Sequence, residues 1–358
     1  MTSGGAPLAE LLDFGLCCPR CKGDLIDQTT GGDGALSCAS CSERYPVLHG
    51  IPDLRVAPDP YIGMDADRAK GQRLAGEGAT SWQQLAARYY EITLDTVPPA
   101  QARRFEAGLL AAQPRSAAAL DEWERLAQAA VDSTQSVLDV GCGTAPLLAE
   151  IGTRQPARTG ALVGVDVAFR WLIVGQQRLA DAGVRAHLVC ACAEALPFRD
   201  ARFGIITSQA TLENVRGQDD AVREMHRTLR PAGRVWVSTA NRLTPAPDPH
   251  LGIPAGGLVP DAIMAAVARR RQALPPVRQL LSRRTLSALL RRSQFSEVRF
   301  DVPSIPLAQR ALAGPLLRVA AQLYDVARAV PPLRSALTMV GPTIIATAIA
   351  DSRAIRRE

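Results

Sequence analysis

Four of the eight cysteines form two short pairs near the N-terminus. Cys18 and Cys21 make one C-x-x-C pair, Cys38 and Cys41 make a second, and sixteen residues separate the two pairs. Two pairs at this spacing can bring four thiolates to one tetrahedral zinc ion. The alternative is a pair of disulfides, which a reducing compartment disfavours. We therefore predict a structural Zn²⁺ held by these four cysteines.

Two other side chains near these cysteines are candidates for zinc ligands. Cys17 competes with Cys18, but the C-x-x-C spacing favours Cys18. His49 is predicted to be a loop residue, since four cysteines already close the site. A domain as short as residues 1–56 has little core, so the metal supplies much of its folding energy.

A second chemical pattern follows the apolar run V-L-D-V, where Gly141 and Gly143 stand at alternate positions. The run and its glycines predict a strand, a tight turn and a helix start, which together present backbone N–H groups to a ligand. A second apolar run ends at Asp166, where a carboxylate can accept from the two hydroxyls of a ribose. Pro146 replaces the third glycine of a dinucleotide fingerprint, which argues against NAD or FAD. The sequence predicts a different, nucleotide-like ligand.

These residues resemble a known family. With Ala145 in the last slot, the loop resembles the D-x-G-x-G-x-G motif of class I S-adenosylmethionine (SAM) methyltransferases, and C-A-E-A-L-P-F at 192–198 resembles the family's adenine-binding D-A-E-x-L-P-F segment. Cys192 stands in the acidic position of that segment. The run at 203–215 resembles the family's fourth strand, with Gly204 where Asp is usual. The resemblance implies cofactor contacts from Asp139, Gly141, Cys142, Gly143, Asp166, Val167, Cys192, Ala193, Glu194, Ser208 and Gln209.

Strands and helices must alternate to position these residues. Apolar runs predict strands at 136–140, 161–165, 185–190, 203–208, 233–239, 296–302 and 342–349. Helices are predicted at 145–153, 168–182, 218–229 and 282–292. We expect an α/β fold with a seven-stranded Rossmann-like sheet over residues 133–358, the last strand antiparallel as the resemblance implies. Within it, an insertion at 306–337 holds a helical run from 308 to 330, broken by Pro315 and ended by Pro331 and Pro332.

The N-terminal part divides into a ribbon and a cap. Residues 8–55, which include the run Y-P-V-L-H-G-I-P, resemble the small zinc-ribbon protein that binds and activates several tRNA, rRNA and release-factor methyltransferases. Residues 57–132 are predicted to form a linker and a helical cap, with helices at 82–94, 100–112 and 117–130. Tyr89 and Tyr90 are candidates to line the cap toward a substrate. The alternative is that they only pack the helices onto the domain.

The substrate is expected beyond the fifth strand, along the Pro-rich stretch from Asn241 to His250. His250 is the first candidate for a general base, because a neutral imidazole could take a proton from a hydroxyl or amine. A surface histidine is the alternative, and Glu213 is the rival base. Asn241 and Arg242 are candidates to orient the substrate.

Charge is distributed unevenly around a formal net charge of +6. Residues 1–56 have a net charge of −3, whereas 261–358 carry sixteen arginines against six acidic residues, a net charge of +10. The basic end could contact RNA, an anionic lipid surface or an acidic substrate, but solvated arginines are the simpler explanation. Without a basic, apolar leader or a run long enough to span a bilayer, we expect a cytoplasmic protein.

Three functions are compatible with these patterns. The favoured one is methyl transfer from SAM to an O or N nucleophile of a small molecule, with the ribbon as a stabilising module. The ribbon and the basic end also allow an RNA or protein substrate, although the fourth strand lacks the N-P-P-Y-type motif of many such N-methyltransferases. Finally, Ala145, Cys192 and Gly204 could mark a methyltransferase-like scaffold with another reaction or a binding role. The oligomeric state cannot be predicted from these features.

Overall fold

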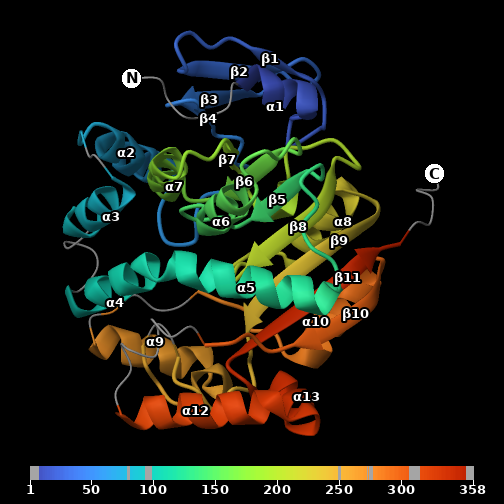
Figure 1. Cartoon of the computed structure of the whole chain (residues 1–358). Helices are drawn as coiled ribbons and strands as arrows, with labels where there is room; N and C mark the ends of the chain where they lie inside the picture. The colour runs from blue at the N-terminus through green and yellow to red at the C-terminus, as the bar shows by residue number, and fades with distance from the viewer. Residues whose placement is uncertain are drawn as a thin grey trace.

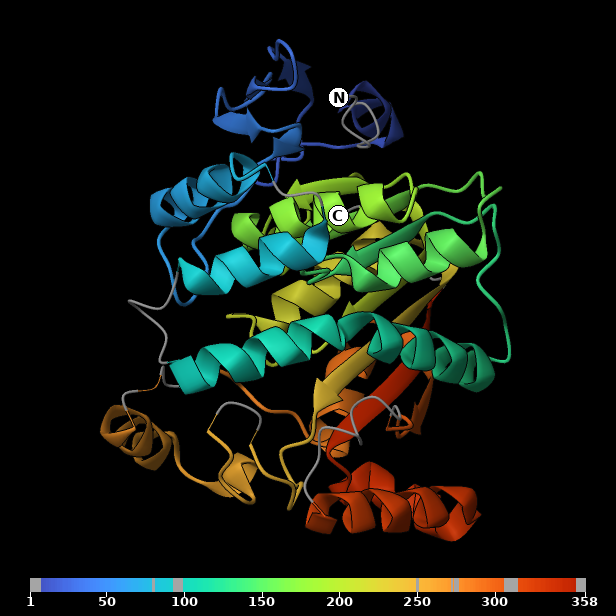
Figure 2. The same cartoon turned by 60° about the vertical axis from the view of Figure 1, so that its left-hand side comes forward.

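The chain contains two sheets, a small one at its N-terminal end and a large one at its centre (Figure 1). The computed structural model describes residues 8–78, 81–92, 99–248, 251–271, 273, 277–305 and 315–351. Figures 1 and 2 show the small sheet at one end of the molecule and the last two helices at the opposite end.

The small sheet is antiparallel, with strand order β1-β2-β3-β4. Its elements are α1 (Leu8–Phe14), β1 (Leu25–Asp27), β2 (Gly34–Cys38), β3 (Arg44–Leu48) and β4 (Ile51–Pro52). Alternate residues of β2 and β3 point inward, which buries Leu36, Tyr45 and Val47. The segment between α1 and β1 and the turn between β2 and β3 bring the two C-x-x-C pairs to one place, as the spacing predicts.

The central sheet has seven strands in the order β10-β11-β9-β8-β5-β6-β7. Its strands are β5 (Val137–Val140), β6 (Leu162–Asp166), β7 (His187–Cys190), β8 (Phe203–Gln209), β9 (Leu229–Ala240), β10 (Phe295–Asp301) and β11 (Thr343–Ala350). β11 is antiparallel to both of its neighbours, and the other pairs are parallel. The predicted α/β class and the antiparallel last strand are confirmed.

Helices cover both faces of this sheet (Figure 1). The helices that alternate with its strands are α6 (Pro146–Arg154), α7 (Phe169–Asp181), α8 (Gln218–Thr228) and α10 (Arg283–Arg292), with the short helix η1 (Ala193–Ala195) after β7. Four helices precede β5: α2 (Met64–Ala75), α3 (Trp82–Glu91), α4 (Pro99–Leu110) and α5 (Ala112–Ala127). Of these, α2 and α3 pack against α7, and α5 packs against α6. The sequence did not predict α2.

The remaining elements follow β9 and β10. They are η2 (Gly256–Leu258), α9 (Asp261–Arg270), α12 (Pro315–Ala329) and α13 (Pro331–Val340). The helical run ends before Pro331 and Pro332 as predicted, since α12 ends at Ala329, but Pro331 also begins a further helix, α13. Proline is well tolerated in the first turn of a helix, where its missing N–H has no intrahelical partner to lose. The expected stretch 306–314 lies outside the described residues.

Within the described part of the chain, no helix is long and apolar enough to cross a membrane.

The N-terminal ribbon is joined to the edge of the central sheet. Asp53 pairs in parallel with Cys190 of the edge strand β7, and the Leu54 N–H donates to the Cys190 carbonyl at 2.7 Å. Leu16 pairs with Phe198 on the loop that follows η1. Ribbon side chains such as Leu36 belong to the same hydrophobic cluster as the core of the large sheet. The ribbon therefore covers a sheet edge that would otherwise expose unpaired backbone groups.

Candidate functional site

Four cysteine thiols converge in the ribbon. The sulfurs of Cys18, Cys21, Cys38 and Cys41 all lie within 4.8 Å of one another. The Sγ–Sγ distances are 3.7 Å from Cys18 to Cys41 and 3.4 Å from Cys21 to Cys38. Four thiolates around a tetrahedral zinc would be roughly 3.8 Å apart, given Zn–S bonds of about 2.3 Å. The cluster is consistent with a structural zinc ion, as predicted, and Cys17 is not part of it.

Neighbouring donors favour a thiolate at Cys38. The N–H groups of Ser40 and Cys41 donate to Cys38 Sγ at 3.4 and 3.5 Å, and the Tyr45 hydroxyl lies 3.2 Å from Cys18 Sγ. Burial would raise the pKa of the Cys38 thiol, but the two N–H groups lower it below its usual value. None of the eight cysteines forms a disulfide bond. His49 lies in a turn outside the cluster, with a φ of 53°.

The predicted glycine turn follows β5 directly. Gly141 has a φ of +77°, and a Cβ there would meet Thr211 Oγ1 at 2.0 Å, so neither the backbone nor the space admits a side chain. Gly143 has a φ of +52°, but a Cβ there would meet no atom within 4 Å. The turn therefore packs tightly on one side and opens into free space on the other. Such an opening is where a ligand can approach the backbone.

Ala145, the last residue of this turn, keeps the backbone conformation that favours glycine. Its φ and ψ are 55° and 35°, and it precedes α6 as the N-cap residue. A left-handed conformation costs a residue with a Cβ about 1–2 kcal/mol. The methyl group is fully buried, so it does not narrow the open side of the turn.

A cavity of about 690 Å³ lies beyond the open side of the turn. Its wall includes seven of the residues predicted to contact the cofactor: Gly141, Gly143, Asp166, Val167, Cys192, Ala193 and Glu194. They come from the carboxyl ends of β5, β6 and β7, where open α/β sheets bind ligands. The volume is within the range of about 300–1,000 Å³ found for small-molecule sites.

Asp166 is held in place by two backbone donors. Its carboxylate accepts from the Gly143 N–H and from the Ala168 N–H, each at 2.8 Å. Each oxygen keeps a second lone pair, so the carboxylate can still accept from two ribose hydroxyls. Burial raises its pKa to about 6, with a smaller contribution from the negative charge of Asp59. The carboxylate is therefore mostly ionised at neutral pH.

The unusual Cys192 contacts the ribbon linker. Its thiol donates to the carbonyl of Ala57 at 3.4 Å. Burial raises the pKa of this thiol, and hydrogen bonding to the backbone of Val56 and Ala57 lowers it in part. The residue at the acidic position of the family motif therefore packs against the linker at the cavity wall.

The linker itself forms one wall of the cavity. Its lining residues are Val56, Ala57, Pro58, Asp59, Pro60 and Tyr61. The sequence predicts this stretch only as a linker, and it gives no sign that Arg170 and Trp171 line the same cavity. One signal was available, since Asp53 and Arg55 are charged residues in an otherwise apolar run.

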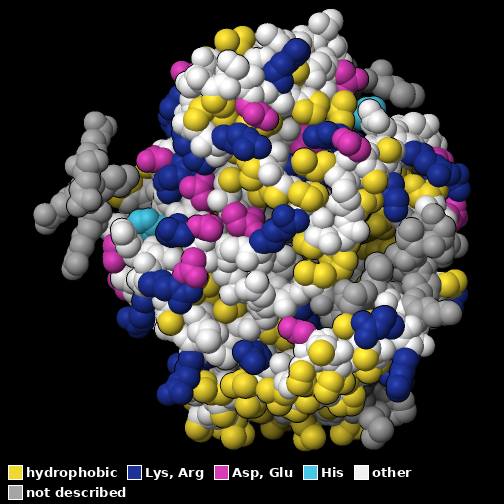
Figure 3. Space-filling view, turned by 180° about the vertical axis from the view of Figure 1, so that it is seen from behind, with side chains coloured by type: hydrophobic (Ala, Val, Ile, Leu, Met, Phe, Trp, Pro, Cys, Tyr) yellow, Lys and Arg dark blue, Asp and Glu magenta, His cyan; other side chains and the backbone are white. Residues whose placement is uncertain are grey.

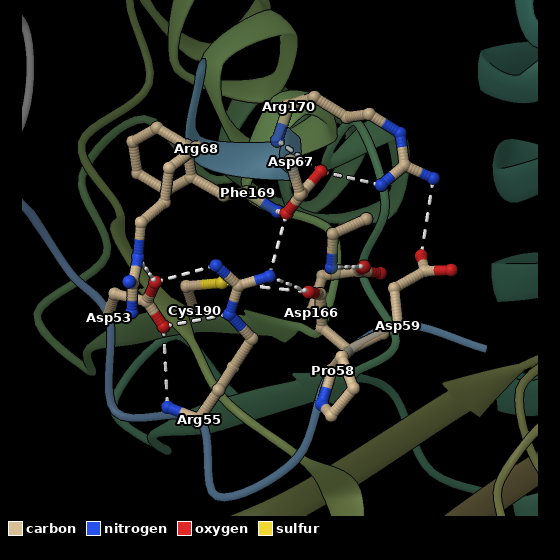
Figure 4. Close-up of polar contacts among 12 residues, drawn as sticks. Asp53, Arg55, Pro58, Asp59, Asp67, Arg68, Asp166, Phe169, Arg170 and Cys190 are labelled. Atoms are coloured by element: carbon tan, nitrogen blue, oxygen red, sulfur yellow. Dashed lines mark hydrogen bonds and ion pairs between the residues drawn. The ribbon is translucent and has the colours of Figure 1, made fainter. Parts of the chain in front are cut away.

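A buried ion network fixes the start of this linker (Figure 4). Arg55 donates from Nε and Nη2 to the two carboxylate oxygens of Asp53 at 2.8 and 2.6 Å. Its Nη1 donates to Asp67 of α2 at 2.7 Å and to the carbonyl of Val167 at 3.0 Å. The side chains of Arg55, Asp53 and Asp67 are fully buried. A buried arginine thus joins the ribbon, α2 and the end of β6.

The network continues to the cavity wall. Arg170 of α7 donates to Asp67 at 2.6 Å and to Asp59 of the linker at 3.2 Å. Arg68 donates to Asp53 at 2.7 Å, so three arginines face three aspartates. Burial would raise the pKa of Asp53, but its bonds to Arg55 and then Arg68 hold it below the usual value. The charges are paired, as buried charges must be.

Four residues predicted at the cofactor lie outside the cavity wall: Asp139, Cys142, Ser208 and Gln209. Asp139 is buried and accepts from the Thr207 hydroxyl at 2.8 Å, and burial raises its pKa to about 7. Ser208 Oγ and Gln209 Nε2 are buried and have no hydrogen-bond partner in the described structure. Their predicted contact with the cofactor stays a prediction.

The candidate catalytic residues have mixed placements. His250 lies outside the described residues. Glu213 is buried and accepts from the Thr239 hydroxyl at 2.8 Å and the Ala240 N–H at 3.2 Å. The Asn241 amide donates to the carbonyls of Met339 and Gly341, which gives it a structural contact. Arg242 is exposed. Glu213, Asn241 and Arg242 are not among the residues that line the cavity.

The two tyrosines of the cap stand one layer behind the cavity. Tyr89 and Tyr90 are buried on α3, and their rings lie 4.2 and 6.2 Å from the ring of Trp171, which lines the cavity. Arg170 donates to the Tyr89 hydroxyl at 3.3 Å. They support the wall, and their contact with a substrate stays a prediction.

Comparisons with known proteins identify the central domain. Residues 138–237 match the family model described as "Methyltransferase domain". The chain is 42% identical over 105 residues to the ubiquinone/menaquinone biosynthesis C-methyltransferase UbiE of Vibrio vulnificus (strain YJ016), covering 29% of this chain and 40% of that protein. It is 39% identical over 112 residues to UbiE of Ralstonia pickettii (strain 12J), covering 31% and 46%. The chain thus spans less than half the length of these curated relatives. It contains a SAM-dependent methyltransferase domain, and the predicted cofactor class is confirmed.

Solved structures with a similar arrangement are more distant. A phosphoethanolamine N-methyltransferase of Haemonchus contortus is 15% identical with a TM-score of 0.43, covering 65% of this chain and 52% of that chain. A possible histamine N-methyltransferase of Thermotoga maritima is 13% identical with a TM-score of 0.40, covering 66% and 88%. Similarity at this level does not indicate a function.

Proposed function

We propose that this protein transfers a methyl group from SAM to a nucleophile of a small molecule, and that the ribbon linker completes the cofactor cavity. The observation that carries the proposal is the charge of the cavity wall. Four acidic residues line it, Asp59, Asp166, Glu194 and Asp220, against two arginines, Arg170 and Arg216.

An acidic wall favours SAM over nucleic acid. The sulfonium of SAM is positively charged, so a wall with excess carboxylates attracts it, whereas the phosphates of RNA would be repelled. The volume also suits a ligand of this size. A small-molecule acceptor, rather than RNA as the second candidate, is supported by the matched relatives, which are named as ubiquinone/menaquinone biosynthesis C-methyltransferases.

The residues of the chain mainly bind and position. SAM supplies an activated methyl group when bound, so little acid–base chemistry is required of the protein. Gly141 and Gly143 let the backbone approach the ligand, and the Asp166 carboxylate can accept from the ribose hydroxyls. Among the described residues, the cavity wall contains no histidine or lysine. We infer that rate enhancement comes from holding the nucleophile and the methyl group in line and excluding water.

The atom that accepts the methyl group is a separate part of the proposal. We propose an O or N nucleophile on the basis of the sequence, while the matched relatives are named as C-methyltransferases, which adds carbon to the candidates. A methyltransferase-like scaffold with another reaction or a binding role, for which Ala145, Cys192 and Gly204 were the grounds, is the alternative. The buried methyl group of Ala145, which leaves the open side of the glycine turn free, supports the cofactor site instead.

Calorimetry with S-adenosylhomocysteine tests the cofactor site. We expect binding at pH 7.5 that weakens as the pH falls below about 6, since the pKa of Asp166 is raised to about 6 and a protonated carboxyl presents an O–H donor in place of one acceptor site. Asp166→Asn should bind about 10-fold more weakly at pH 7.5 and show little pH dependence in this range. No heat with either SAM or S-adenosylhomocysteine would contradict the proposal.

A second measurement tests the substrate class. Labelled SAM is supplied with the purified protein to a lysate, and the label is followed in small molecules, RNA and protein. Label in the small-molecule fraction supports the proposal, and the position of the label in the product identifies the acceptor atom. Label only in RNA or protein would replace the substrate class while leaving the cofactor site intact.

A further inference from the structure

The last two helices expose a continuous row of large apolar side chains. Seven side chains, here called the α12–α13 face, are 37–65% exposed: Val319, Leu323, Val326, Val330, Leu333, Met339 and Val340. Figure 3 shows hydrophobic side chains crowded over the lower end of the molecule, the end at which Figures 1 and 2 show α12 and α13. Soluble monomers rarely expose apolar patches of this extent without a use for them.

The row follows one side of α12. Val319, Leu323 and Val326 recur at spacings of four and three residues, so they lie on one helix face. Ala321 and Tyr324, on the other side, are buried against the rest of the protein. The helix is amphipathic, but the larger aliphatic side chains point outward.

Two arginines of these helices point inward. Arg328 donates to Glu122 of α5 at 2.9 Å, and Arg334 donates to Asp301 of β10 at 2.6 and 2.7 Å and to Glu122 at 2.7 Å. These arginines hold the helices onto the body of the protein through ion pairs. Their charges are therefore directed away from the α12–α13 face.

The surroundings of this face are basic. Asp325 is the sole acidic residue between positions 302 and 350, and it is only half exposed. On α9, at the same end of the molecule in Figures 1 and 2, Ile263 is exposed, as are Arg269 and Arg270 in the last turn and Asp261 in the first. Arg318 of α12 is exposed as well. An apolar surface with basic neighbours matches the pattern of proteins that lie in the headgroup region of a membrane.

We propose that the α12–α13 face docks onto the surface of a lipid bilayer that contains anionic lipids. The exposed leucine and valines would enter the boundary of the acyl chains, and the arginines would contact the headgroups. A second copy of the chain is the less favourable occupant. In a two-fold symmetric dimer the same basic surroundings would face each other, and like charges would oppose the contact. The protein thus lies on the membrane without crossing it.

Vesicle co-sedimentation tests this proposal. Full-length, zinc-loaded protein is mixed with vesicles of phosphatidylcholine containing one-third phosphatidylglycerol, or with phosphatidylcholine alone. We expect binding to the mixed vesicles and binding to neutral vesicles that is weaker by about fivefold for each arginine at the surface. The double variant Leu323→Glu with Val326→Glu should bind the mixed vesicles about 100-fold more weakly, because each change removes a large apolar side chain from the lipid contact.

Ile26→Glu provides the matched control. Ile26 is 53% exposed on β1 of the ribbon, at the other end of the molecule, so its replacement should leave vesicle binding unchanged. Circular dichroism and S-adenosylhomocysteine affinity establish that both variants are folded. Equal binding of the double variant and the original chain would overturn the proposal. A lack of vesicle binding would also overturn it. This holds if the chain sediments as a monomer, and equally if it sediments as a dimer that the double variant converts to monomers.

Discussion

The two ends of the molecule differ in where their apolar side chains lie. At the ribbon end, the fully buried Arg55 joins Asp53 to Asp67, and the apolar side chains of the ribbon enter the main hydrophobic cluster. At the other end, Arg328 and Arg334 turn inward to ion pairs, and leucine and valine side chains face out. Both ends are accessory to the same central sheet, yet only one of them has its apolar surface covered by the chain itself.

This difference indicates where each accessory part finds its partner. The partner of the ribbon is internal, since Asp53 and Leu54 pair with the edge strand β7 and the linker walls the cofactor cavity. The apolar surface of α12 and α13 has no such cover among the described residues. Changes at the ribbon end should therefore alter stability and cofactor binding. Changes on the α12–α13 face should alter contacts with an external surface.

Removal of the metal is the largest test of the ribbon end. Structural zinc contributes about 10–16 kcal/mol of apparent binding free energy in small zinc domains, so Cys21→Ser should lose the metal and unfold the ribbon. The linker would then be released from the cavity wall, and S-adenosylhomocysteine should bind at least about 10-fold more weakly. Metal content by mass spectrometry and calorimetry measure the two effects.

Cys17→Ala is the matched control for this change. Cys17 is as buried as its neighbour Cys18 but lies outside the four-thiol cluster. The variant should therefore keep one zinc per chain and bind the cofactor product normally. If Cys21→Ser lost zinc but kept full affinity, the ribbon would be only an attachment, and the linker would not depend on it.

The buried arginine is the next test. Arg55→Ala leaves Asp53 and Asp67 buried without their shared partner, which costs about 3–5 kcal/mol of unfolding free energy. Arg68→Ala removes a bond to the same Asp53 from a side chain that is 25% exposed, so we expect a loss of about 1 kcal/mol or less. Urea unfolding of the two variants compares them. Equal losses would mean that the network is not centred on Arg55.

The central sheet was predictable because its signal is local. Buried parallel strands are short apolar runs between turn residues, and the predicted strands overlap all seven strands of the structure. The main difference is β9, which begins at Leu229 rather than at 233. Its pairing with β8 is irregular between Leu229 and Arg234, where Ala232 has a φ of 60°. The glycine turn and Asp166 were predictable for the same reason, because their spacing along the chain sets their geometry.

The cavity wall from the linker was not predictable. Arg55 bonds to the carbonyl of Val167, 112 residues away, and Cys192 bonds to Ala57, 135 residues away. No pattern within a window of sequence encodes such contacts. Cys192 departs from the family motif in the sequence, but its contact with the linker appears only in the structure. The sequence also does not predict that the large aliphatic side chains of α12 face outward. An amphipathic pattern does not show which side of a helix packs against the protein.

Two leucines test the contrast between the ends directly. Leu54, in the ribbon segment that pairs with β7, is fully buried, and Leu323 on α12 is 65% exposed. Leu54→Ala removes apolar contacts and leaves a cavity, so we expect a loss of about 2–5 kcal/mol. Leu323→Ala should change the unfolding free energy by no more than about 0.5 kcal/mol in dilute solution, because that side chain is already in contact with water.

The same pair becomes more informative when it is measured with anionic vesicles. Lipid that binds only the folded protein raises its apparent stability, and Leu323→Ala should reduce this gain because it weakens the lipid contact. Leu54→Ala should keep the gain in full, since Leu54 is buried at the opposite end. A large loss for Leu323→Ala without lipid would show that the α12–α13 face is covered in the free protein. The contrast between an internal and an external partner would then be wrong.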